Sequence, residues 1–419
     1  MAILSLAAKS LWNRRLTSAL VVASIALSVA LLLGVERLRT QARASFANTL
    51  SGTDLIVGAR GSPLNLLLYS VFRIGDPTNN VSWRGYQTFA THPQVAWTVP
   101  LSLGDSHRGF PVLGTTEAYF QHYRYGRNQP QRFAEGREFA DTFDAVLGAT
   151  VADRLGYRLG QSIIIAHGVG AVSFAQHDDK PFQVVGILAR TGTPVDQTVH
   201  ISLDGMEAIH ADWFGGAPIP GLRLTPEQVR QIDLTPKTIT AFLVGLHSRT
   251  AIFRMQREIN EFSGEPLLAI LPGLTLQQLW DLMGLAENAL LVVSGLVVLV
   301  GLTVMLAALL TGLNERRREM AILRAVGARP AQIFALVLGE SLVLALVGAT
   351  LGVLLLQGGL LAAGPLLEGR LGLAIAGWPP SSHELILLGS VLGCGLLAGL
   401  FPAWRAYRFS LADGMTIRI

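Results

Sequence analysis

Four apolar runs limit what this chain can fold into. They occupy residues 16–35, 289–313, 333–356 and 385–402. Each run is close to the roughly 20 residues that an α-helix needs to span a bilayer. Half of the 419 residues are apolar and 15% are charged, and the mean hydropathy is +0.43, which is too apolar for an ordinary soluble enzyme. The sequence therefore predicts an integral membrane protein with four transmembrane helices.

The first apolar run has a second interpretation. Lys9, Arg14 and Arg15 precede it, and residues 42–44 (Ala-Arg-Ala) loosely resemble a cleavage site, so a secretory signal peptide is an alternative. Because the run has the length that spans a bilayer, we expect an uncleaved first transmembrane helix.

Arginines beside the runs predict the orientation. With four spans, most of them fall on one side of the membrane: Arg14, Arg15, Arg316, Arg317, Arg318, Arg324, Arg329, Arg405 and Arg408. The side rich in arginine is normally the cytoplasm. Arg37, Arg39 and Arg43 follow the first run, but they begin a long loop, and long loops are translocated largely regardless of charge. We therefore expect both termini in the cytoplasm.

This topology predicts how the chain is divided. We expect a first cytoplasmic segment and span (1–37), an extracytoplasmic domain (38–285), a second span (286–313), a short cytoplasmic helix (314–332), a third span (333–357), an outer loop (358–384), a fourth span (385–403) and a cytoplasmic tail (404–419).

The extracytoplasmic domain has the mixed pattern of a compact α+β module. A segment rich in glycine and proline, residues 215–226, predicts a boundary between two lobes. From residue 274 the chain is expected to be helical into the second span. The pattern predicts strands at 54–58, 162–166, 183–188, 198–202 and 238–246, and helices at 145–155 and 251–262.

Glycines recur at four-residue spacing in the last two runs, and such faces let helices approach closely in lipid. The alternative is chance, because the chain has 44 glycines. The predicted packing pairs are Gly348 with Gly352, Gly389 with Gly393, and Gly395 with Gly399.

Glu340 is a carboxylate in an apolar setting near the start of the third run. It is a candidate ion or proton site. Near a helix end, such a residue more often lies at the headgroup level or forms a pair inside the bundle, and we favour that interpretation.

Motifs for enzymatic chemistry are missing from the sequence. None of the three lysines follows the glycine that a phosphate-binding loop requires, and no Gly-x-Ser-x-Gly or His-Glu-x-x-His pattern occurs. The net charge of +4 is explained by the arginines beside the spans rather than by nucleic-acid binding. The sequence therefore predicts neither catalytic nor cofactor-binding residues.

The histidines are a weaker candidate for metal binding. Eight of the nine lie in the predicted extracytoplasmic domain, and the densest cluster is His177-Asp178-Asp179. Such oxygen and nitrogen donors suit a divalent metal. Scattered histidines without ligand spacing more often belong to an ordinary surface, so we expect no metal site. Cys394 has no cysteine partner for an internal disulfide.

The connector between the second and third runs carries the most specific motif. Residues 315–333 read Glu-Arg-Arg-Arg-Glu-Met-Ala-Ile-Leu-Arg-Ala-Val-Gly-Ala-Arg-Pro-Ala-Gln-Ile. Met320, Leu323, Arg324 and Gly327 follow at three- and four-residue spacing, which gives a helix one mixed apolar and cationic stripe. Glu319 can also pair with Arg316 on the same helix. An ordinary cytoplasmic loop with arginines is the alternative.

This connector resembles the coupling segment of the MacB/FtsX-like permeases of ABC transporters, also called type VII. Residues 401–408 with 411–413 are similar to the family's C-terminal motif, although Ser410 stands where a proline is usual. Residues 184–188 are a weaker match. The order of one span, a large outer domain and three spans also agrees with the family.

The resemblance implies a permease subunit in a bacterial inner membrane. Such permeases work as dimers on cytoplasmic ATPase subunits, which bind ATP and Mg²⁺, and they move an outer domain by mechanotransmission. The implied cargo is a lipoprotein, an amphipathic compound such as an antibiotic, haem or a peptide, with a periplasmic adaptor or lipoprotein as a further partner. The residues implied in ATPase coupling are Arg316, Glu319, Met320, Leu323, Arg324, Val326, Gly327 and Ala328.

Two other functions remain open at this point. One is a regulator that transports nothing and activates a periplasmic enzyme, as the cell-division members of the family do. The other is a membrane-anchored receptor without an ATPase.

Overall fold

The computed structural model describes residues 14–168, 178–214, 217–219, 223–371 and 379–408. Two compact units make up the chain. We call the first, residues 1–41, 284–367 and 375–419, the helical unit. The second, residues 42–283 and 368–374, is the α+β unit.

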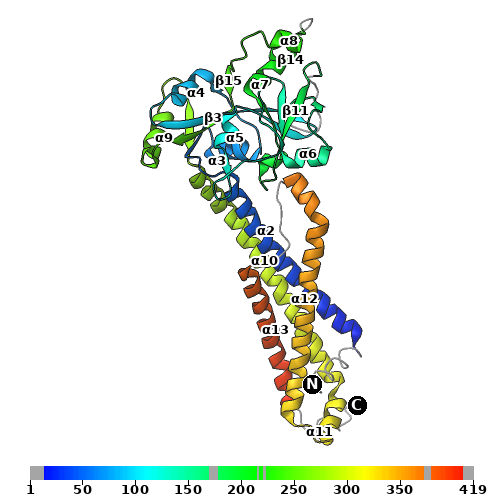
Figure 1. Ribbon diagram of the computed structural model, residues 1–419. Coiled ribbons are helices and arrows are strands. Elements are labelled where there is room, and N and C mark those ends of the chain that lie inside the picture. The colour runs from blue at the N-terminus through cyan, green and yellow to red at the C-terminus, as the bar shows by residue number, and fades with distance from the viewer. Residues whose placement is uncertain (1–13, 169–177, 215–216, 220–222, 372–378, 409–419) are drawn as a thin grey trace. The chain divides into compact units, whose positions relative to one another are not determined.

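Among its described residues, the helical unit contains four long apolar helices, each with a stretch suited to spanning a membrane. They match the four predicted runs, and Figure 1 shows them side by side. Apolar side chains from all four helices meet in one core, including Val21, Met305, Leu344 and Val391. The helices are α2 (Arg15–Thr49), α10 (Pro272–Glu315), α12 (Pro330–Leu371) and α13 (Ser382–Arg408).

Three of these helices are much longer than a membrane span. α2 has 35 residues, α10 has 44 and α12 has 42, against roughly 20 needed to cross a bilayer. Helix α10 begins at Pro272, in agreement with the helical continuity expected from residue 274. Residues 42–49 of α2 and 272–283 of α10 belong to the α+β unit.

The α+β unit is built on one mixed sheet of eleven strands among the described residues. Most neighbouring strands are antiparallel, but β12 runs parallel to β4 and β11 runs parallel to β8. The main path is β17 (Leu267–Ile270), β1 (Leu55–Ala59), β16 (Ala241–Leu246), β3 (Val95–His107), β4 (Phe110–Thr115), β12 (Val199–Ser202), β8 (Asp144–Leu147), β11 (Phe182–Leu188) and β7 (Phe133–Gly136), with β9 (Ser162–Ile163) on β11 and β10 (Ala166–His167) on β3.

Strand β3 connects the two halves of this sheet. With 13 residues it pairs with β16 at one end and with β4 at the other. One half therefore combines the segments 55–107 and 241–270, while the other is formed by residues 110–202. The chain leaves the first half after β3 and returns to it at β16. Part of the predicted boundary, residues 215–226, lies outside the described residues.

Short helices and strands surround the sheet (Figure 1). The helices are α3 (Pro63–Leu67), α4 (Trp83–Ala90), α5 (Ala118–His122), α6 (Ala149–Leu155), α7 (Leu203–His210), α8 (Pro226–Val229) and α9 (Ile252–Asn260), with the single turns η1 (Leu68–Phe72), η2 (Pro194–Gln197) and η3 (Arg249–Ala251). The short strands are β2 (Val81–Ser82), β5 (Arg124–Tyr125), β6 (Gln129–Pro130), β13 (Trp213–Phe214), β14 (Ala217–Pro218) and β15 (Thr238–Ile239).

The predicted helix at 145–155 is wrong over residues 145–148. Residues Asp144–Leu147 form β8, and α6 begins only at Ala149. All four residues of β8 are buried, because the strand has β11 on one side and β12 on the other. A short apolar run can be a strand or a helix by pattern alone, and here the pairing with two neighbouring strands decides.

Candidate functional site

The connector predicted at residues 314–332 forms a separate short helix, α11 (Arg317–Ala325). Helix α10 ends at Glu315. Arg316 then has backbone angles of φ −98° and ψ 14°, which lie outside the helical range, so the chain changes direction at this residue. In Figure 1, α11 joins α10 to α12 at one end of the helical unit.

A glycine ends α11. Gly327 has a φ of +104°, a left-handed conformation that glycine adopts without steric cost. Its amide donates to the Arg324 carbonyl at 3.0 Å, and the Ala328 amide donates to the Leu323 carbonyl at 3.0 Å. These two bonds define a Schellman C-cap. Gly327 and Ala328, which the family resemblance assigned to ATPase coupling, therefore shape the end of the helix.

One face of α11 is packed into the helical unit. Met320 is 2% exposed and Ala321 is 9% exposed. The cluster around Met320 includes Val337 of α12 and Ala403 of α13. Residues 401–408, the second segment that carries the family resemblance, thus supply part of the surface on which the first one rests.

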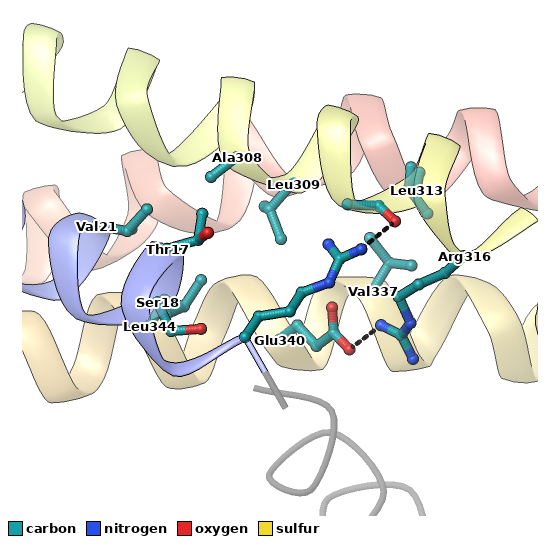
Figure 2. A pocket seen from close by; sticks show the side chains of 12 residues that line it. Thr17, Ser18, Val21, Ala308, Leu309, Leu313, Arg316, Val337, Glu340 and Leu344 are labelled. Atoms are coloured by element: carbon teal, nitrogen blue, oxygen red, sulfur yellow. Dashed lines mark hydrogen bonds and ion pairs between the residues drawn. The ribbon is translucent and has the colours of Figure 1, made fainter. Parts of the chain in front are cut away.

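Ion pairs hold the junction between α10 and α11. The Arg316 guanidinium contacts the Glu340 carboxylate at 2.7 Å and the Glu319 carboxylate at 2.8 Å. Figure 2 shows the Arg316 side chain directed at Glu340 of α12. The predicted pair between Glu319 and Arg316 is confirmed. For Glu340, the structure shows the expected pairing inside the bundle.

A second arginine, in the residue just before α2, approaches the same junction. Arg14 lies 2.5 Å from the Glu315 carboxylate and donates to the Gly312 carbonyl at 3.0 Å. A cavity of about 30 Å³ lies between these groups, which is room for about two water molecules. Its lining includes Arg14, Ser18, Leu309, Arg316, Val337 and Glu340 (Figure 2). The junction is therefore a polar cluster inside otherwise apolar helices.

The other face of α11 points away from the bundle. Ile322 is 60% exposed and Val326 is 84% exposed. Arg318, also exposed, precedes Ile322 by four residues, so the three side chains follow one another along one side of the helix. We call Arg318, Ile322 and Val326 the outer ridge. Exposed apolar side chains in such a row are typical of a contact surface for another protein.

The predicted coupling residues are divided between these two faces. Met320 is buried and Leu323 packs beside it, so neither lies on the outer ridge. Arg316 is committed to its ion pairs, whereas Glu319 and Val326 are exposed and Arg324 is half-buried. Ile322 was missed because the stripe read from the sequence began at Met320. The four-residue spacing of Ile322 and Val326 is the signal that could have found it.

The predicted packing glycines also differ in their surroundings. A Cβ on Gly352 would lie 2.7 Å from the Ala26 carbonyl oxygen of α2, and one on Gly348 would lie 2.7 Å from the Ile25 side chain. On α13, a Cβ at Gly399 would lie 2.1 Å from Ser341, and one at Gly395 would lie 3.0 Å from Ala345. These four glycines line close helix contacts. Within the part of the chain that the structure describes, Gly389 and Gly393 have no such neighbour within 4 Å.

Comparison with known proteins finds two family matches. Residues 18–260 match the MacB-like periplasmic core domain. Residues 291–411 match the FtsX-like permease C-terminal family. The second match includes α11 and the ion pairs of the junction.

Curated relatives carry related descriptions. The chain is 25% identical over 415 residues to "Macrolide export ATP-binding/permease protein MacB" of Azoarcus sp. (strain BH72), covering 93% of this chain and 56% of that protein. It is 24% identical over 376 residues to "Pyoverdine export ATP-binding/permease protein PvdT" of Pseudomonas fluorescens (strain Pf0-1), covering 86% and 52%. The chain therefore spans about half the length of these relatives.

Two further similarities cover shorter regions. Over 126 residues the chain is 33% identical to "Uncharacterized ABC transporter permease YknZ" of Bacillus subtilis (strain 168), covering 29% of this chain and 30% of that protein. The crystal structure of the periplasmic region of MacB from Actinobacillus actinomycetemcomitans has a TM-score of 0.36 and 11% identity, covering 55% of this chain and 94% of that structure.

The match to the MacB-like periplasmic core covers more than half of the 419 residues. The α+β unit that this match spans is formed mainly between α2 and α10, as in the predicted plan of one span, an outer domain and three further spans. These findings imply a multi-pass protein of the inner membrane. The chain belongs to the MacB/FtsX-like family of ABC transporter permeases.

Proposed function

We propose that this permease passes the movement of a separate cytoplasmic ATPase to its periplasmic domain, and that α11 receives that movement. The outer ridge carries the proposal, because it combines one cationic and two exposed apolar side chains on a helix whose other face is buried. An apolar row beside a positive charge suits a groove on another protein. Both termini and α11 then lie in the cytoplasm.

The junction gives a route from the ridge into the membrane helices. Arg316 begins α11 and bonds to Glu340 of α12. Arg14 joins the same junction from the start of α2. A force on α11 therefore acts on three helices through short charged contacts rather than through a flexible loop. The last residues of α2 (42–49) and the first residues of α10 (272–283) belong to the α+β unit. We therefore propose that these two helices transmit the movement.

The cargo is proposed from chemistry and from the relatives' descriptions. The sequence has no nucleotide-binding motif, so the chain itself provides no ATP site of the phosphate-loop type. Relatives described as exporters of macrolides and pyoverdine support export of a small compound. A lipoprotein or a peptide is the other cargo that the family resemblance implies. We propose that two permease copies assemble with the ATPase.

Co-purification tests the role of the outer ridge. The full-length protein is expressed in its native host, extracted in mild detergent, and assayed for bound ATPase subunit and for ATP hydrolysis. Ile322→Asp with Val326→Asp should lower the recovered ATPase at least about tenfold, since each places a charge where an apolar contact is required. Both side chains are exposed, so the melting temperature of the permease should stay unchanged.

A conservative pair provides the matched control. Ile322→Val with Val326→Ile keeps an apolar surface of similar volume and should recover the wild-type amount of ATPase. Wild-type recovery from the double aspartate variant would contradict the proposed ridge. If the wild-type protein recovers no ATPase at all, the coupling function itself is wrong.

A further inference from the structure

Three side chains from distant parts of the sequence meet in the α+β unit. Asp105 lies on β3, and His167 lies directly opposite it on β10. His210 is the last residue of α7. One ligand atom from each of the three lies within 4.8 Å of the other two. No motif spacing in the sequence links these three residues, and His177 of the predicted cluster lies outside the described residues.

The distances between the three groups suit a small metal ion. His167 Nδ1 lies 3.1 Å from Asp105 Oδ1 and 3.2 Å from His210 Nε2. His210 Nε2 lies 3.7 Å from Asp105 Oδ2. In a tetrahedral zinc site with bonds of about 2.0–2.1 Å, ligand atoms are about 3.3–3.4 Å apart. The three groups are therefore already close to the separations that such an ion requires.

The hydrogen bonds also prepare one histidine for metal binding. His210 Nδ1 lies 2.9 Å from the Met206 carbonyl, which can only accept a hydrogen bond, so Nδ1 carries the proton. In the neutral ring, Nε2 then presents its lone pair to the cluster. Metal-binding histidines are typically oriented in this way by a backbone carbonyl or a carboxylate.

Charge and access favour a cation at this point. The Asp105 side chain is 2% exposed, and a buried carboxylate is costly without a positive partner. The two imidazoles remain accessible, with 41% of the His167 side chain and 29% of the His210 side chain exposed. The Trp213 ring packs against both, with centroid distances of 5.3 Å and 5.8 Å. An ion can thus enter from solvent and keep a water molecule as its fourth ligand.

We propose that Asp105, His167 Nδ1 and His210 Nε2 bind one divalent transition-metal ion, with Zn²⁺ as the best fit. Two imidazoles and one carboxylate are donors that zinc accepts in tetrahedral geometry. The site is independent of α11 and of the ATPase, so it stands or falls separately from the proposed coupling function. In the metal-free protein, the proton on His167 Nδ1 occupies the space of the ion and must leave when the metal binds.

Zinc titration of the full-length protein tests the site. The protein is purified in detergent with a tag that contains no histidine, stripped with EDTA, and titrated with Zn²⁺ by calorimetry at neutral pH. We expect one ion per chain and a melting temperature that rises with Zn²⁺ and falls again with EDTA. Replacing Zn²⁺ with Co²⁺ should produce the visible absorption bands of tetrahedral cobalt.

Variants identify the ligands. His210→Asn and His167→Asn should each weaken zinc binding by more than about 100-fold, the upper end of the cost of losing a mere supporting residue, and should abolish the cobalt bands. Asp105→Asn preserves the shape of the side chain and should weaken binding by at least about tenfold. His247→Gln, at an exposed histidine elsewhere in the α+β unit, is the matched control and should bind zinc as the wild type does.

Three outcomes would overturn the proposal. The first is a wild-type protein that binds no zinc at micromolar concentrations. The second is binding that His210→Asn leaves unchanged, which would move the ion to other residues. The third is a cobalt complex without tetrahedral bands, which would contradict the coordination. Circular dichroism of each EDTA-treated variant shows that it is folded before binding is measured.

Discussion

Two arginine–glutamate pairs lie near opposite ends of the helical unit. Arg37 and Glu384 form a two-pronged contact, with N–O distances of 2.8 Å and 2.6 Å, and their side chains are 4% and 3% exposed. Arg316 contacts the Glu340 carboxylate at 2.7 Å and shares its guanidinium with Glu319. Arg15 is the first residue of α2 and follows Arg14, which lies at the second junction. Arg37 is 22 residues beyond Arg15, about 33 Å along the helix.

The difference between the two pairs concerns their surroundings. The forked contact of Arg37 fixes both distance and orientation between α2 and α13. Arg316 has a 13% exposed side chain, a cavity beside it and a second partner that is 64% exposed. We infer that the first pair holds α2 and α13 in a fixed arrangement. The second pair lies at a junction that solvent and a partner protein can reach.

Breaking the Arg37–Glu384 pair should have the largest effect on stability. Glu384→Gln should cost about 3–5 kcal/mol, because it removes the matching charge from a fully buried guanidinium. Thermal unfolding in detergent measures the loss. The double replacement Arg37→Met with Glu384→Met should restore most of it, since apolar side chains of similar volume fill the same space. An unchanged melting temperature for Glu384→Gln would contradict a stabilising role for the Arg37–Glu384 pair.

In the α+β unit, the buried titratable group His200 is held neutral rather than as an ion pair, and this predicts a pH dependence of stability. Burial lowers the pKa of His200 to about 3, so this histidine stays neutral in the folded domain. The unfolded chain takes up its proton near pH 6.5. The contribution of His200 to the free energy of unfolding is therefore fully present above pH 6.5. Below that pH the free energy of unfolding should fall by about 1.4 kcal/mol for each pH unit, until the pKa of His200 in the folded protein is reached.

The His200→Leu variant isolates this contribution. Other groups also titrate in acid, so the quantity to compare is the slope of unfolding free energy against pH between 6.5 and 4.5. The variant should have the shallower slope. Equal slopes for the two proteins would show that His200 does not remain neutral.

Removing Arg316 should lower stability less than Glu384→Gln does, but it should lower ATPase-dependent activity more. Arg316→Gln should lower the unfolding free energy by about 1–3 kcal/mol, the range for losing hydrogen bonds to charged partners. Because it also removes the ionic contact between the start of α11 and α12, ATPase-dependent activity should fall further than the amount of folded protein does. Comparing both readouts with those of Glu384→Gln at equal folded protein tests whether the two pairs have different roles.

The smallest effect is expected at the exposed partner of Arg316. Glu319 has a 64% exposed side chain, and exposed ion pairs contribute little. Glu319→Gln should change stability by no more than about 0.5 kcal/mol in the thermal unfolding assay. A loss as large as that of Arg316→Gln would mean that Glu319, rather than Glu340, holds the junction.

The sequence could predict features that depend on local pattern. The four spans follow from the length of apolar runs, because a bilayer sets that length regardless of tertiary contacts. The Glu319–Arg316 pair follows from helical spacing, and α11 from its motif. The same reasoning misassigned residues 145–147, where neighbouring strands rather than local preference decide the structure.

Only the tertiary structure decided which residues face which partner. Helical periodicity relates the side chains of α11 to one another, but the helices beside it determine that Met320 is buried and Ile322 is exposed. Arg37 and Glu384 are 347 residues apart, and His167 lies 62 residues from Asp105 and 43 from His210. No local pattern links residues at such separations, because their meeting depends on how whole strands and helices pack.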